Sequence, residues 1–475
     1  MTIDWTLAID VAVLCLLLLS ATLARMHLGF LQRSLIPNSI VAGLLGFALN
    51  GEMLGLLPVD AGRYGAYVYH LLAVAFVAIG LQGAERGRPG RGAVFTGFAL
   101  TFGYALQAVL GVAIAFALMC TIVPDLFPTY GFMLLLGFGQ GPGQAYALGH
   151  AWEASGFRDG GNVGLTFAAL GYLWACFVGV WLVRRAMLRA GAVGAAAPID
   201  PSVARGVIDD PAQRPSAGAV STSPEAVDGL AFHIALVGGV YGATYLLLFG
   251  AEAVLRQLAP DSSAISQVIV TLWGLHFIFA ALMAMAARGL LVRCRLAHLV
   301  DAGLTNRVAG TAVDFMVIAA LASISLAVIR SHWLPILLIT VPGGLATTWF
   351  VCRFVARYAP GHPVEYLATI YGTLTGTLAT GLGLARICDP HFLTPAARNL
   401  VLGCGLATPL SAPLMAMMIV PLLGLGDGRL FDYQLGTLVV LAIYCAVLGL
   451  VWRCARRREA CLPELIEERP EHERA

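Results

Sequence analysis

Two polar, glycine-rich stretches lie inside otherwise apolar sequence and carry the groups most able to bind a solute. In the first, residues 136–146, glycine occupies every second position from 137 to 143, and Pro142 lies between the last two glycines. Glycine and proline destabilise a helix and leave backbone groups unpaired, which hydrocarbon tolerates only where protein or a water-filled cavity surrounds them. We therefore predict a non-helical stretch whose free amides and carbonyls, with the side chains of Gln140 and Gln144, face a solute.

The second stretch, residues 371–383, mixes glycine with threonine and is too polar to face lipid. Backbone amides there would suit a carboxylate and backbone carbonyls a small cation. Hydroxyl oxygens are hard ligands appropriate to Na⁺, so four side chains are candidate ligands: Thr373, Thr375, Thr377 and Thr380. The alternative for both stretches is close helix packing, in which small residues also recur.

Charged side chains near these stretches are the other candidates. Asp314 is the one acid that we place firmly inside an apolar span, where a carboxylate is costly and usually functional. It could help hold Na⁺, titrate with a coupling proton, or lie at a helix end. Arg386 and Asp389 follow the second stretch, where they could pair as a gate, bind a substrate carboxylate, or form a basic rim. No histidine, cysteine or nucleophile pattern predicts a metal centre or an enzyme.

The composition is that of a membrane protein. Of the 475 residues, 59% are hydrophobic and 12% charged, and the mean hydropathy is +0.81, far above soluble domains. All 29 basic residues are arginine, which excludes mechanisms that need a lysine. The net charge of +2 gives no field that would attract nucleic acid, so we expect no nucleic-acid partner, and no cofactor either.

About 20 apolar residues cross a bilayer as a helix, and several segments approach that length. They lie near residues 5–24, 35–49, 67–81, 93–123, 163–188, 230–255, 265–287, 308–329, 333–354, 397–423 and 435–451. Residues 191–229 are rich in alanine, proline, glycine and serine, a composition that predicts a flexible cytoplasmic linker.

Arginine placement predicts the topology, because short cytoplasmic loops carry the excess of basic residues. Clusters occur near residues 25–33, 86–91, 184–189, 288–307, 353–357 and 453–458. Three apolar segments separate the clusters at 86–91 and 184–189, although two cytoplasmic loops require an even number of crossings; the same conflict recurs after 353–357. We therefore predict a re-entrant hairpin near residues 130–157, entering from outside, and another near 366–390, entering from the cytoplasm.

Together these features predict an all-α integral membrane protein of two inverted repeats. Each repeat has about five transmembrane helices and one re-entrant hairpin. Residues 1–190 form the first repeat, 191–229 the linker, 230–425 the second repeat, and 426–475 an extra transmembrane helix with a cytoplasmic tail. The N-terminus would be periplasmic and the C-terminus cytoplasmic. Inverted repeats whose broken helices meet near the midplane are the architecture of secondary transporters.

The chain resembles the glutamate:sodium symporter family of bacterial inner membranes over most of residues 5–425. The resemblance rests on residues 36–45 (IPNSIVAGLL), on residues 139–145 (GQGPGQA) followed by Gly156 and Phe157, and on the pattern of residues 376–383. It implies inverted five-helix repeats, two re-entrant loops that hold substrate and Na⁺, and a homodimer. It also implies that five residues line the site: Gly139, Gly141, Gly143, Gly376 and Thr380.

The roles of Gln140, Gln144, Thr375, Thr377 and Asp314 are instead our inference from residue chemistry. The chain departs from the family at Gln140 and Pro142, where well-known members have histidine and threonine. It also lacks the family's proline in the second hairpin and adds a C-terminal span. These departures bear on the substrate more than on the fold.

Three functions follow as hypotheses. The leading one is a secondary active transporter of the bacterial inner membrane, with Na⁺-coupled symport of glutamate or a related anionic amino acid by alternating access. The second is a proton- or Na⁺-coupled transporter of another organic anion, with Asp314 carrying the proton. The third, from another class, is a membrane receptor or scaffold that uses the linker and the C-terminal tail. Under the first two, the partners are a small anionic solute, Na⁺ and membrane lipid.

Overall fold

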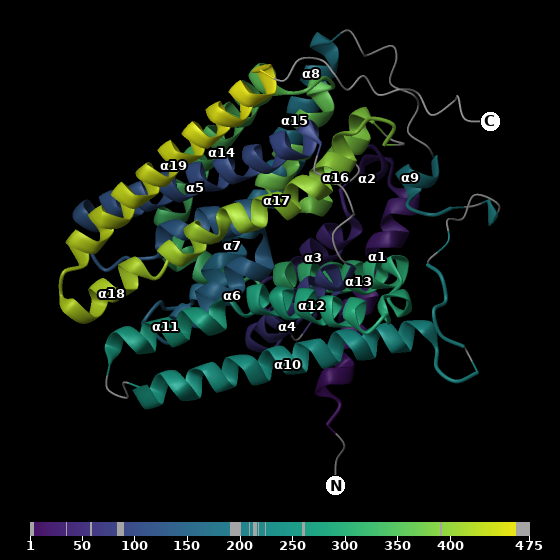
Figure 1. Cartoon of the computed structure of the whole chain (residues 1–475), viewed down its shortest axis with the longest axis horizontal. Coiled ribbons are helices and arrows are strands. Elements are labelled where there is room, and N and C mark those ends of the chain that lie inside the picture. Colours follow the sequence, from purple (N-terminus) through teal and green to yellow (C-terminus); the bar gives the residue numbers. More distant parts are fainter. Residues whose placement is uncertain are drawn as a thin grey trace.

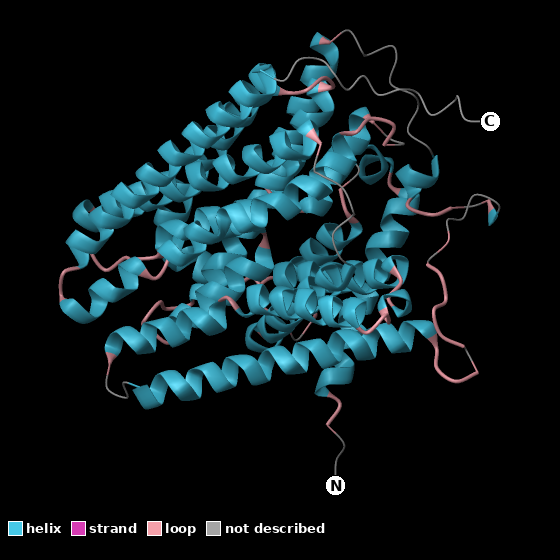
Figure 2. Ribbon diagram, viewed as in Figure 1, coloured by secondary structure: helices cyan, strands magenta, loops and turns pink. Residues whose placement is uncertain are grey.

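The computed structural model describes residues 4–34, 36–57, 59–82, 90–190, 201–208, 210–211, 216, 218–223, 225–258, 262–389 and 392–461. Over these residues the chain is helical and has no β-strand beyond an isolated bridge between Asn50 and Leu57 (Figure 2). Within the described part of the chain, ten helices are long and apolar enough to cross a membrane. The protein is therefore a multi-pass, all-α membrane protein. Arg86, Arg88 and residues 462–475 lie outside the described residues.

The first half of the chain alternates long helices with short ones. The long helices are α1 (Thr6–His27), α4 (Ala61–Gln82), α5 (Arg91–Thr121) and α7 (Gly160–Trp174), which continues through η3 (Ala175–Gly179) into α8 (Val180–Arg189). The short ones are α2 (Gly29–Ser34), α3 (Asn38–Leu49), η1 (Tyr130–Phe132), η2 (Leu134–Gln140) and α6 (Pro142–Glu153).

The second half follows a short helix, α9 (Pro201–Arg205). Its first helices are α10 (Gly229–Leu258), α11 (Ser263–Gly274), α12 (His276–Arg293), η6 (Ala297–Leu299), α13 (Ala302–Ala322) and α14 (Leu326–Tyr358). The remainder are α15 (Pro363–Leu374), α16 (Leu378–Cys388), α17 (Ala396–Met417), α18 (Val420–Asp427) and α19 (Leu430–Cys461).

The helices pack around two main hydrophobic cores. One core joins α5 to η2, α14, α15 and α17, and the fully buried side chains of Phe138 and Tyr371 belong to it. The other joins α4 and α13 to α1 and α3 and includes Leu72 and Leu321. Helix α7 contributes to both cores, with Phe167 in the first and Tyr172 in the second. Figure 1 shows α5, α17 and α19 on one side of the molecule and α4, α10, α12 and α13 on the other.

One predicted span, residues 308–329, is wrong as a single helix. Helix α13 ends at Ala322 and α14 begins at Leu326, after Ser325 accepts a hydrogen bond from the backbone amide of Val328 as an N-cap. The carboxylate of Glu52 also accepts hydrogen bonds from the amides of Leu326 (2.5 Å) and Ala327 (3.2 Å). A serine cap and a carboxylate at the positive end of a helix thus start α14 earlier than hydropathy indicates.

Two other predicted spans are discontinuous. Residues 265–287 divide at Leu275 into α11 and α12. Residues 35–49 contain only the 12 residues of α3, which begins at Asn38 after Pro37. A helix of this length rises roughly 18 Å, which is less than the hydrocarbon thickness. Helix α3 alone therefore does not cross the membrane. This break places Pro37 and Asn38 beside a cavity described below.

Part of the segment predicted as a flexible linker packs against the helices. Helix α9 contacts α1 and α2, and the Ser221 hydroxyl donates a hydrogen bond of 2.7 Å to the Leu299 carbonyl. Residues 191–200 lie outside the described residues. The predicted domain boundaries remain predictions.

Candidate functional site

The first glycine-rich stretch is mostly helical, which corrects the prediction of non-helical backbone over residues 136–146. A π-helix continues to Gln140, and Gly141 alone leaves the helix, with φ 92° and ψ 179°. Pro142 then starts α6 instead of disrupting it, because a proline in the first turn loses no hydrogen bond and its fixed φ suits a helix. Gly143 and Gln144 therefore belong to the first turn of α6.

Close packing accounts for the other glycines of this stretch. A Cβ placed on Gly139 would lie 2.5 Å from Oε1 of Gln107, and one on Gly143 would lie 2.7 Å from Cδ1 of Leu72. Real Cβ atoms do not approach other atoms so closely. Helix packing through small residues, the alternative raised by the sequence, explains Gly139 and Gly143 without a solute.

The second glycine-rich stretch is a pair of short helices, α15 and α16, joined by a turn at residues 375–377. The two helices are in close contact, since a Cβ on Gly372 would lie 2.7 Å from Cα of Gly381. The hydroxyls of Thr373 and Thr375 donate to the carbonyls of Thr369 (2.9 Å) and Tyr371 (2.8 Å). These two side chains are buried, and both hydroxyls donate their hydrogen bonds to backbone carbonyls of α15.

The turns of the two helix pairs meet. A Cβ on Gly141 would lie 2.7 Å from Cγ2 of Thr377, and 3.5 Å from the Gly376 carbonyl oxygen. Oγ1 of Thr377 lies 3.3 Å from Oγ1 of Thr380, which is itself close to Gly376. The structure thus brings together Gly141, Gly376, Thr377 and Thr380, which the sequence analysis assigned to two separate hairpins.

Tyr172 of α7 lies at this junction, and the sequence analysis did not identify it. Its side chain is 1% exposed, and its hydroxyl is 3.9 Å from the position of a Cβ on Gly141. Thr377 lies near this hydroxyl, but the hydroxyl has no hydrogen-bond partner of good geometry. A buried hydroxyl without a good partner is available to a ligand. A single tyrosine within an apolar helix gave no signal in the sequence.

Gln107 of α5, also missed, connects the two helix pairs. Its Nε2 donates to the Leu374 carbonyl at the end of α15 (2.8 Å) and to Oγ1 of Thr347 (3.1 Å), while its Oε1 packs against Gly139. Oε1 of Gln107 is buried without a hydrogen-bond partner, and so are the Oε1 atoms of Gln140 and Gln144. The signal for Gln107 was a lone amide in an otherwise apolar helix.

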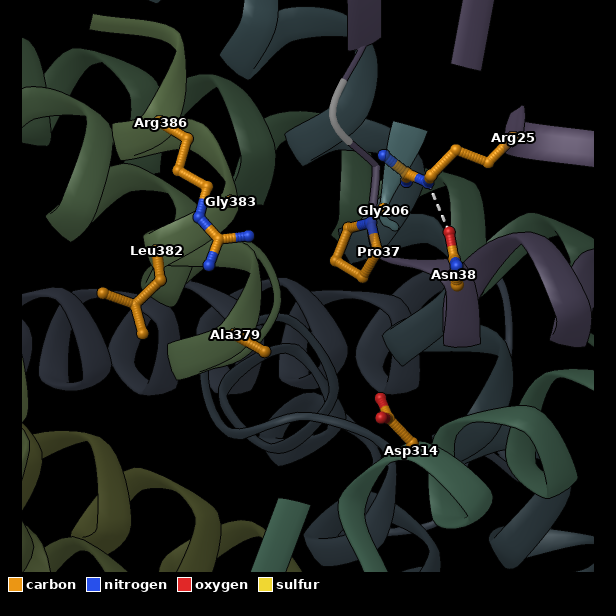
Figure 3. Close-up of a pocket in the computed structure, with 9 residues that line it drawn as sticks. All are labelled: Arg25, Pro37, Asn38, Gly206, Asp314, Ala379, Leu382, Gly383 and Arg386. Atoms are coloured by element: carbon orange, nitrogen blue, oxygen red, sulfur yellow. Dashed lines mark hydrogen bonds between the residues drawn. The ribbon is translucent and has the colours of Figure 1, made fainter. Parts of the chain in front are cut away.

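A cavity of about 350 Å³ lies beside α16. Its lining residues are Arg25, Pro37, Asn38, Gly206, Asp314, Ala379, Leu382, Gly383 and Arg386 (Figure 3). In this view Arg25 and Arg386 lie at one end of the cavity and Asp314 at the other. Asp314 lies within α13, and its exposed surface faces this cavity. The predicted site acid is therefore accessible to water from within the protein.

The sequence left open that Arg386 pairs with Asp389 as a gate, and this alternative is wrong. The Asp389 carboxylate accepts hydrogen bonds from the Leu393 amide (2.8 Å) and from both the amide (2.8 Å) and the hydroxyl (2.6 Å) of Thr394. The Arg386 guanidinium instead lies 5.3 Å from the ring centre of Phe392. Asp389 closes a loop, which leaves Arg386 facing the cavity.

The three predicted Na⁺ ligands divide between two places. Thr373 and Thr375 lie within α15, whereas Asp314 lies in the cavity wall on α13. Among the described residues there is no cluster of three or more histidine, cysteine, aspartate or glutamate side chains suited to a metal ion.

No protein-family model, curated protein or solved structure matches the chain. Fold and site define a class: a multi-pass helical membrane protein in which two pairs of short helices meet beside a water-accessible cavity.

Proposed function

We propose that the protein is a secondary active transporter that moves a small anionic solute by alternating access. The observation that carries this proposal is the contact between Gly141 and Thr377, at the turns of two helix pairs from opposite halves of the chain. Short helices that end inside a membrane protein expose amides and carbonyls there, and transporters use such ends to bind solutes and coupling ions. The cavity lined by α16 supports the proposal, because a solute could reach the turns through it.

The packing of the helices supports two repeats of opposite orientation. Helix α3 of the first half packs on α13 of the second, and in the same way α12 of the second half packs on α4 of the first. Likewise, α7 of the first half packs on α14, and α17 of the second half packs on α5. In each half a pair of short helices follows the longest one: η2 and α6 follow α5, and α15 and α16 follow α14. These correspondences support the proposed inverted repeats and, with them, re-entrant hairpins.

The placement of arginine supports the proposed orientation in a bacterial inner membrane. The arginine-bearing ends of α8 and α19 lie near the same edge of the molecule, away from the N-terminus (Figure 1). Under the positive-inside rule this edge is cytoplasmic, with the N-terminus periplasmic and the C-terminus cytoplasmic. The cavity, with Arg25 and Arg386, would then open inward.

The choice of glutamate as solute, of Na⁺ as coupling ion and of a homodimer rests on the family resemblance. The site chemistry is compatible with an anion and a cation together. Turn amides near Gly376 and Thr377 suit a carboxylate, and the unpaired Oε1 atoms of Gln107, Gln140 and Gln144 are oxygen donors of the kind that Na⁺ accepts.

A second candidate is proton-coupled transport of another organic anion, and Asp314 favours it. The carboxylate faces the cavity, and no arginine or histidine of the described chain forms an ion pair with it. An acid in a span without a basic partner is suited to exchange a proton during transport.

Stabilisation by ligands tests the solute and the ion. Purified protein would be melted with a panel of amino acids and organic anions, with Na⁺ or with choline as the cation. A ligand that binds only the folded state at 100 times its Kd stabilises it by about 2.7 kcal/mol. We expect glutamate to raise the melting temperature in Na⁺ but not in choline. Stabilisation by another anion, unaffected by Na⁺ but dependent on pH, would favour the second candidate, and a panel without any effect would contradict both.

A further inference from the structure

We propose that the end of the cavity lined by Arg25 and Arg386 is a second anion-binding site, separate from the helix turns, in which these two arginines bind one oxyanion between them. The ligand is a carboxylate or phosphate group, carried either by a soluble anion or by a lipid headgroup. Arginine suits this role because its planar fork of donors matches both groups.

Arg25 is a buried cation that lines this end of the cavity. Arg25 is 5% exposed, and its Nε donates a hydrogen bond to Oδ1 of Asn38. Nδ2 of Asn38 in turn donates to Oγ1 of Thr22 (3.1 Å). No aspartate or glutamate of the described chain lies within ion-pair distance of Arg25. Asn38 thus orients the guanidinium, and Arg25 lines the cavity (Figure 3). A buried charge that lacks a partner is costly, and an anion in the cavity removes that cost.

Arg386 of α16 lines the same end of the cavity as Arg25 (Figure 3). Asp389, its nearest acid in sequence, is engaged by Leu393 and Thr394, so it does not neutralise Arg386. Asp314 lies at the other end of the cavity (Figure 3). Two like charges that face one space repel each other unless an anion lies between them. Among the described residues, no acidic side chain forms an ion pair with either arginine, so this end of the cavity carries two like charges.

The linker completes the wall of this site. Gly206, directly after α9, has φ 74°, and a Cβ on it would lie 3.1 Å from Cδ of Arg25. The backbone thus passes directly over the arginine, at a position where a larger residue would be strained and crowded. The cavity of about 350 Å³ has room for a small anion between α1, α16 and the backbone at Gly206.

This site does not depend on transport, so its test differs from that of the proposed function. Full-length protein would be placed in nanodiscs of phosphatidylcholine and melted while inorganic phosphate replaces chloride at constant ionic strength. We expect phosphate to stabilise the native protein. Arg25→Gln and Arg386→Gln should each weaken the apparent phosphate affinity by about 10-fold or more, because each removes a charge-assisted hydrogen bond.

Arg429→Gln is the matched control, since Arg429 is exposed and pairs with Asp432 away from the cavity; it should respond like the native protein. Arg386 is exposed, so its variant remains informative if Arg25→Gln does not fold. In a second arm, nanodiscs contain phosphatidylglycerol. Arginine-dependent stabilisation by phosphate identifies a soluble anion, and arginine-dependent stabilisation by phosphatidylglycerol identifies a lipid headgroup. The proposal is overturned if neither stabilises the native protein, or if the cavity variants and the control respond alike.

Discussion

Gly141 and Thr377 are in contact although they belong to helix pairs from opposite halves of the chain. A Cβ on Gly141 would lie 2.7 Å from Cγ2 of Thr377, and the positive φ of 92° is itself unfavourable for any residue with a side chain. The two turns are therefore matched in shape at the point where the proposed solute site begins.

Gly141→Ala is expected to destabilise the protein by about 1 to 2 kcal/mol from backbone strain, with a further cost from the clash. Thr377→Ser removes only Cγ2, so the double variant should recover part of the loss. A coupling of about 0.5 kcal/mol or more in a double-mutant cycle, measured by unfolding, would confirm the contact. Gly238→Ala is the control, because nothing lies within 4 Å of a Cβ there. Strictly additive effects would mean that the turns do not touch.

Gln107→Leu is expected to destabilise the protein by about 1 to 3 kcal/mol, because it leaves the buried Leu374 carbonyl without its donor. Gln82→Leu is the matched control, since Gln82 donates to Asn306 at an exposed position. Unfolding of both variants in the same detergent measures the difference. Equal effects would show that Gln107 does not hold the end of α15.

Asp389→Asn should change how stability depends on pH. Burial alone would raise the pKa of Asp389, but hydrogen bonds from Thr394 and Leu393 outweigh it and hold this pKa below its usual value. The ionised carboxylate therefore stabilises the folded state above the ordinary aspartate pKa near 4, and this contribution disappears as pH falls through the lowered pKa. The melting temperature of Asp389→Asn should fall furthest below that of the native protein at neutral pH. The difference between the two melting temperatures should shrink as the pH is lowered. A difference independent of pH would contradict this role.

Asp314→Asn should separate the two coupling schemes. If Asp314 carries a proton, the variant loses pH-driven uptake by about 10-fold or more while solute binding survives, because the amide cannot release a proton. If Na⁺ is the coupling ion and Asp314 helps to hold it, the variant instead weakens the Na⁺ dependence of binding. Asp432→Asn, at an exposed ion pair, is the control. Unchanged uptake and unchanged Na⁺ dependence would remove Asp314 from either role.

The sequence predicted the membrane class, most of the long helices, and interruptions of the long-helix pattern within residues 130–157 and 366–390. These features depend on hydropathy and on helix-breaking residues, which are local. The first predicted break was too broad, because a proline such as Pro142 can either disrupt a helix or begin one, and only the backbone shows that it begins α6. The early start of α14 was also missed, because it depends on Glu52 from a distant loop.

The site could be predicted only in part for a similar reason. Gly141, Gly376, Thr377 and Thr380 stood out by composition, and the structure brings them together. Gln107 and Tyr172 lie within mainly apolar helices, and their importance depends on which helices pack beside them. Arg25 was informative in the sequence only as a marker of topology, because its burial depends on α3 and on the linker.

Solute accumulation in reconstituted vesicles tests the central claim most directly. Native protein, Gly141→Ala and Gly238→Ala would be reconstituted at equal density, and labelled glutamate would be followed under an inward Na⁺ gradient with and without an ionophore that dissipates it. The account predicts that the native protein and Gly238→Ala accumulate glutamate and that the ionophore abolishes this accumulation. Uptake by Gly141→Ala should be slower than native uptake by about 10-fold or more. If the folded native protein accumulates neither glutamate nor any other small anion under a Na⁺ or proton gradient, the transporter proposal is wrong.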